Sequence, residues 1–134
     1  MKVLLISVAL FFCAANFAYA STGWITVATT DEGGAWEAQA GSLNLTKNRG
    51  DTLIAVVIGR VTQSGTNTVS LYKWYVPVKD CAAGNGTIVS LNISGEYEFE
   101  NDFVLGGGNV ASAIAAAICG AAKQAAENAQ KKSM

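Results

Sequence analysis

Short apolar runs separated by glycine, asparagine and aspartate dominate residues 23–103 of the chain. Branched and aromatic residues in runs of this length, bounded by turn-forming residues, are typical of β-strands. The pattern therefore predicts a mainly antiparallel sheet of five to seven strands. The expected strands are residues 24–27, 35–38, 52–61, 68–78, 87–93 and 96–100.

Three features refine this sheet. Residues 52–61 form the longest run and are apolar on both alternating faces, which predicts a central strand covered on each side. Pro77 has no N–H to donate and should weaken the ladder near the end of the fourth segment. Ser94-Gly95, between the last two segments, is a two-residue signal for a hairpin.

The hydrophobic period changes after the three glycines at residues 106–108. Asn109 follows them and can cap the N-terminus of a helix. The apolar stripe of this helix must be buried against a sheet face, which predicts an α+β fold with a C-terminal helix packed on the sheet. The stripe consists of Val110, Ile114 and Ile118, widened by Ala113, Ala117 and Ala121.

The expected domain organisation is a single α+β domain in residues 21–120. Residues 121–134 are rich in alanine, lysine and glutamine, which leaves two alternatives for them, a helical extension or a disordered end.

The first 20 residues have the composition of a secretory signal peptide. Lys2 precedes an apolar run over residues 3–13, and Ala18-Tyr19-Ala20 matches the small-residue cleavage pattern, so we expect cleavage between Ala20 and Ser21. The run is shorter than the roughly 20 residues that span a bilayer. We therefore expect an exported protein of the periplasm, the cell surface or the extracellular medium, with no membrane span after cleavage.

Composition and charge exclude several functions. The chain has 134 residues, 9 basic and 10 acidic side chains and no histidine. Without histidine there is no Ser-His-Asp triad, no Cys-His dyad and no histidine-ligated zinc site. The scattered cations form no basic face, so a nucleic acid partner is not expected. We predict no catalytic, metal-binding or cofactor-binding residues and no cofactor.

Two cysteines remain after cleavage, Cys81 and Cys119, because Cys13 belongs to the leader. A pair of cysteines in an exported chain predicts a disulfide, which would tether the helix to a strand that ends at Asp80-Cys81. A reactive thiol is the alternative, but few cations lie nearby to lower a thiol pKa.

Four carboxylates alternate with aromatic residues near the end of the sheet region. The alternation is typical of a half-buried strand whose acidic side chains face water, and we consider this face a candidate binding surface. Calcium binding or a paired-carboxylate hydrolase would instead require the acids to converge. The carboxylates are Glu96, Glu98, Glu100 and Asp102.

The order of landmarks resembles the bacterial surface-adhesin protein E-like domain over residues 23–120. The landmarks are Trp24, Trp36, Arg60, Asp80-Cys81, the glycines at 106–108 and Ile118-Cys119. The chain departs from the family pattern at Trp36-Glu37, where Tyr-Asp is usual, and before the helix, where Pro-Gly-Ser is usual. The resemblance implies a small antiparallel sheet with a terminal helix, binding of host or matrix proteins, and compatibility with a homodimer, but it transfers no binding residue.

Together these observations predict a small exported non-enzymatic protein that binds a protein or another macromolecule of the envelope or the extracellular space. An inhibitor of a hydrolase, inserting an exposed loop at residues 82–86 into its target, is one alternative. A small hydrolase that uses the carboxylates from Glu96 to Asp102 is another.

Overall fold

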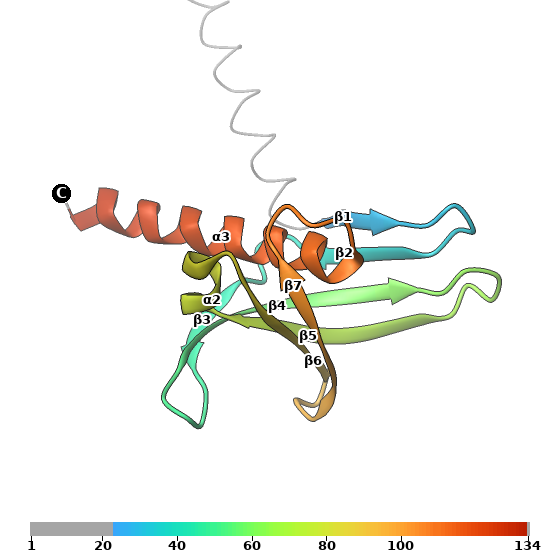
Figure 1. Cartoon of the computed structure of the whole chain (residues 1–134), viewed down its shortest axis with the longest axis horizontal. Helices are drawn as coiled ribbons and strands as arrows, with labels where there is room; N and C mark the ends of the chain where they lie inside the picture. Colours follow the sequence, from blue (N-terminus) through green and yellow to red (C-terminus); the bar gives the residue numbers. More distant parts are fainter. Residues whose placement is uncertain (1–22, 134) are drawn as a thin grey trace, which may run out of the picture.

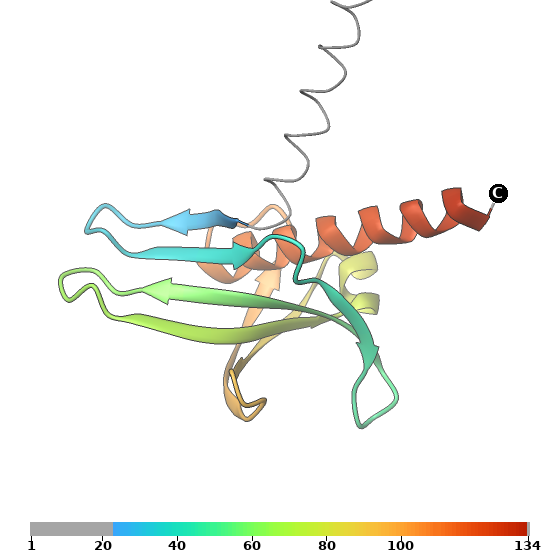
Figure 2. The same cartoon turned by 180° about the vertical axis from the view of Figure 1, so that it is seen from behind.

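The computed structural model describes residues 23–133. It contains one seven-stranded antiparallel sheet with two helices on one of its faces (Figures 1 and 2). The predicted α+β class, the antiparallel sheet and the C-terminal helix packed on it are confirmed. The predicted signal peptide and its expected cleavage site between Ala20 and Ser21 lie outside the described residues. The elements are β1 (Trp24–Thr29), β2 (Ala35–Gln39), β3 (Asn44–Lys47), β4 (Leu53–Thr62), β5 (Val69–Pro77), α2 (Val78–Ala83), β6 (Asn85–Asn92), β7 (Tyr97–Val104) and α3 (Val110–Ser133).

Neighbouring strands in the sheet follow the order β1-β2-β4-β5-β6-β7, and β3 pairs with β4 as well. The hairpin predicted at Ser94-Gly95 joins β6 to β7. Its loop contains three residues, because the N–H of Asn92 bonds to the carbonyl of Glu96, and Gly95 adopts a left-handed φ of 94°. Only glycine takes this conformation without strain, which explains the residue at this position.

A corner in the chain separates β2 from β3. Both strands pair with the same edge of β4, β2 with its C-terminal half and β3 with its N-terminal half. Between them the Ser42 hydroxyl accepts a hydrogen bond from the N–H of Ile58 at 3.0 Å and donates one to the carbonyl of Gln39 at 2.8 Å. The hydroxyl thus provides Ile58 with a partner where the main-chain ladder is interrupted.

The hydrophobic core lies between α3 and the sheet. Its largest fully buried side chains are those of Trp74, Phe103, Ile118 and Val76. Asn109 caps α3 as predicted, since its Oδ1 accepts a hydrogen bond from the N–H of Ser112 at 2.9 Å. The helix continues to Ser133, so the described part of the tail is helical.

The buried stripe of α3 differs in part from the predicted one. Ile114 and Ile118 are buried, but Ala117 is exposed. The stripe instead includes Ala115, Cys119 and Ala122. Successive helical residues are rotated by about 100°, so the face that meets the sheet is centred between the 114/118 row and the 115/119 row.

The prediction that β4 is covered on both sides is wrong in one respect. Both helices pack on the face that carries Ala55 and Val57, and no helix of the described region covers the opposite face (Figures 1 and 2). Ile54 on that opposite face is nevertheless only 6% exposed. Its register partners are Thr46 on β3 and Pro77 on β5, so Ile54 has cross-strand neighbours on both sides.

The sequence did not predict β3 or α2, and Cys81 lies in α2 rather than at the end of a strand. Pro77 ends β5 and directly precedes this short helix with a φ of −60°. Gly84 ends the helix in the left-handed conformation, φ 85°, and its N–H bonds to the carbonyl of Asp80. Proline before and glycine after a short segment are ordinary helix boundary signals.

Candidate functional site

The acidic residues singled out in the sequence do not form a cluster. Glu98, Glu100 and Asp102 lie along β7, at one edge of the sheet, and are exposed, while Glu96 lies in the turn before it and accepts a hydrogen bond from the Asn92 amide. In residues 23–133, no group of three or more histidine, cysteine, aspartate or glutamate side chains is arranged to hold a metal ion. The convergence that a calcium site or a carboxylate hydrolase requires is therefore not seen.

Tyr97 interacts with this acidic strand. Its hydroxyl donates a hydrogen bond to Oε1 of Glu100 at 3.1 Å. Partial removal from water, together with this hydrogen bond, raises the pKa of the Tyr97 phenol. The strand thus presents carboxylates and two exposed aromatic rings, those of Tyr97 and Phe99, to solvent.

Residues 82–86 do not form the exposed loop that an inhibitor would insert into a target. Ala82 and Ala83 belong to α2, Gly84 ends it, and Asn85 and Gly86 begin β6. A methyl group on Gly86 would overlap the side chain of Asp80, so the chain is closely packed here.

Arg60, a landmark of the resemblance, belongs to a local cluster on the sheet face that the helices leave open. Its Nε donates to Oε1 of Glu37 at 2.7 Å, and its guanidinium lies 4.3 Å from the centre of the Trp24 ring. The hydrogen bond with Glu37 raises the pKa of Arg60. The cluster is satisfied internally and joins β1, β2 and β4.

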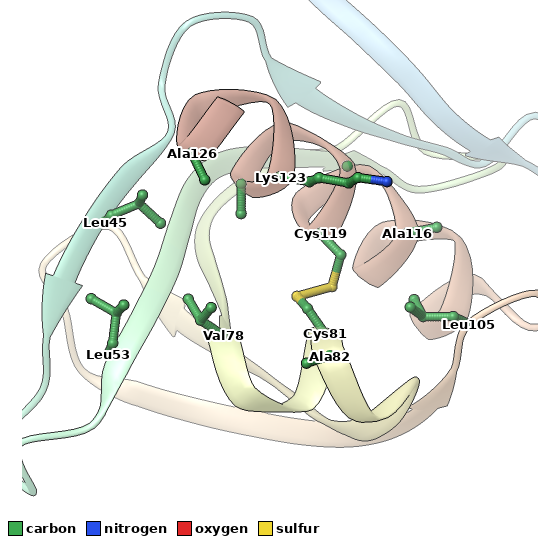
Figure 3. A pocket seen from close by; sticks show the side chains of 12 residues that line it. Leu45, Leu53, Val78, Cys81, Ala82, Leu105, Ala116, Cys119, Lys123 and Ala126 are labelled. Atoms are coloured by element: carbon green, nitrogen blue, oxygen red, sulfur yellow. A yellow bond between two sulfur atoms is a disulfide. The ribbon is translucent and has the colours of Figure 1, made fainter. Parts of the chain in front are cut away.

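An apolar groove of about 530 Å³ runs along the face that the helices cover, between the β3–β4 hairpin, α2 and the middle of α3 (Figure 3). Leu45 and Leu53 line one side and Leu105 the other, with the disulfide between them. Leu45 and Leu53 remain 41% and 43% exposed, so two neighbouring leucine side chains on this wall of the groove are open to solvent. Lining residues from the helices are Val78, Cys81, Ala82, Ala116, Cys119, Gly120, Ala122, Lys123 and Ala126.

The predicted disulfide between Cys81 and Cys119 is confirmed, and it forms part of the groove lining. It joins α2 to α3 with a Cα–Cα distance of 5.5 Å. The covalent bond fixes α2 and α3, two of the elements that line the groove, relative to each other.

Lys123 is the only charged residue among the described residues that line the groove. Its side chain extends along the rim, with Nζ as the blue atom of Figure 3. The ion pairs found within residues 23–133 join Lys47 to Asp51 and Arg60 to Glu37, so Lys123 has no carboxylate partner there.

The groove has the size and the lining of a ligand-binding cleft. Ligand sites are typically preformed apolar clefts of about 300–1,000 Å³ with a small number of polar groups. The groove matches that description, with one cation and no described acid or second nucleophile beside it.

Comparisons with protein-family models, curated proteins and solved structures found no match to this chain. None of the helices within residues 23–133 is long and apolar enough to cross a membrane.

Sequence reasoning missed the groove because its parts are far apart in the chain. Leu45 belongs to the short strand β3, while Ala126 lies in the tail, for which the sequence allows either a helical extension or a disordered end. One sequence signal pointed to the groove. If the alanine-rich tail continues the helix, the helix has more apolar surface than the stripe that packs in the core, and the rest can line a groove.

Proposed function

We propose that the protein is an exported, non-enzymatic binding protein that takes an apolar segment of another macromolecule into this groove. The observation that carries the proposal is the pair of exposed leucines, Leu45 and Leu53, facing a wall of small apolar residues on α3. Exposed apolar surface of this kind commonly marks a binding site.

One feature of the sequence supports a non-enzymatic role, and another supports export from the cytoplasm. The chain contains no histidine, and its N-terminus has the pattern of a signal peptide. The landmarks shared with the protein E-like adhesin domain support a partner at the cell surface or in the periplasm.

The test is capture of a partner by the immobilised chain 21–134 from envelope and matrix extracts, compared with a Leu45→Asp variant. A carboxylate in the groove would have to be desolvated when the apolar segment binds, so the retained partner should fall at least tenfold. Val69→Asp is the matched control, because Val69 is also an exposed strand residue, 54% exposed, at the far end of the sheet.

The proposal predicts that Val69→Asp captures as much as the wild type. Thermal melting first verifies that both variants are folded. Equal capture by the wild type and Leu45→Asp, or no retained partner at micromolar concentration, would show that the groove is not the binding site.

A further inference from the structure

We infer that the segment taken into the groove is an acyl chain with an anionic group at its end, so that the partner is an acylated, anionic macromolecule. The inference rests on the proposed function, since it names the chemistry that the same groove would recognise. It follows from the groove lining and from the position of Lys123.

The lining favours a chain without hydrogen-bonding groups. A polypeptide segment would bring an N–H and a carbonyl at each residue, and the aliphatic side chains of the lining could pair with none of them, which leaves only the free main-chain edge of β3. Apart from Lys123, the side chains that line the groove are aliphatic residues or the disulfide. An acyl chain needs only apolar contacts, which Leu45, Leu53 and Leu105 provide.

Lys123 favours a negatively charged group at the end of the acyl chain. Its ammonium is exposed, lies at the rim, and has no carboxylate partner in residues 23–133. An anion attached to a buried acyl chain would therefore find a complementary charge where the chain leaves the groove. A cationic end group would be repelled by Lys123, and an uncharged one would gain no charge pairing from it.

The first experiment measures binding of decanoate, undecanoate and dodecanoate to the folded chain 21–134 by calorimetry, below their micelle concentrations. Burial of each added methylene should tighten binding about fourfold until the groove is filled. Leu45→Asp should abolish the binding and Val69→Asp should leave it unchanged. Affinity that does not depend on chain length would overturn the inference.

The second experiment tests Lys123. An exposed ion pair contributes little, so Lys123→Gln should weaken dodecanoate binding about two- to fivefold in low salt, with a smaller effect in 0.5 M salt. Binding of dodecanol should not change. Lys131→Gln, in the last turn of the same helix, is the matched control. Equal effects of the two lysine substitutions would contradict the role given to Lys123.

Competition separates this inference from the proposed function. If dodecanoate displaces the captured partner, both stand. If capture depends on Leu45 but no carboxylate binds or competes, the acyl inference fails while the function stands; an extended peptide paired with the free edge of β3 would give this result. If capture does not depend on Leu45, the proposed function fails whatever the carboxylates do.

Discussion

Gly59 allows the largest buried side chain to pack against the middle of the sheet. It lies in β4, and the ring of Trp74, which is only 2% exposed, covers it. A Cβ atom at this position would overlap the ring atoms of Trp74. The sequence suggested no role for Gly59, although a glycine inside a strand often marks such a close approach.

Gly59→Ala should therefore destabilise the protein by about 1–3 kcal/mol, the range of overpacking substitutions, because the buried ring cannot move freely. Urea unfolding monitored by tryptophan fluorescence measures the change. Gly108→Ala is the control, since a Cβ there meets nothing within 4 Å. Similar stabilities of the two variants would contradict the close packing at Gly59.

Among the elements, the regular and strongly patterned ones were predictable and the short ones were not. The N-cap and the two isoleucines of α3, and the hairpin at Ser94-Gly95, follow from local signals that tertiary contacts reinforce. The strand β3 has four exposed residues and a partner on one side only, so it carries no alternation to recognise. The six residues of α2 are too few for a helical period.

The cap of α3 can be tested with one substitution at two sites. Asn109→Ala removes the acceptor for the Ser112 N–H and should cost about 1 kcal/mol of stability. Asn128→Ala, at an exposed site inside the helix, should be neutral or stabilise by a few tenths of a kcal/mol, because alanine is the better helix former. Thermal unfolding followed by circular dichroism compares them, and a loss at Asn128 as large as at Asn109 would refute the cap.

At the scale of the whole molecule, the cysteines predict the disulfide but not the groove that it lines. Two cysteines in the part of a chain that is predicted to be exported suffice to predict the bond between Cys81 and Cys119. The groove beside it depends on how β3, α2 and the middle of α3 meet in space, and no local sequence pattern specifies that arrangement. The open sheet face could not be predicted for the same reason. The apolar pattern of β4 predicts cover on both faces, but the helices pack on only one of them.

Loss of the disulfide should lower the stability of the whole domain. The bond closes a loop between residues 38 apart in sequence, so the chain-entropy model gives about 4 kcal/mol. The double variant Cys81→Ala/Cys119→Ala should melt on the order of 15 °C below the wild type. Native chain 21–134 should show no thiol that reacts with Ellman's reagent; two titratable thiols would refute the bond in solution.

The hydroxyl of Ser42 has a mechanical consequence for the groove. It joins β2 to β4 at the point where the chain leaves one strand and turns into β3, which carries Leu45. The corner therefore fixes where the chain leaves β2, and the β3–β4 ladder that follows then sets Leu45 on the wall of the groove opposite α3. One hydroxyl outside the groove thus helps to position a side chain inside it.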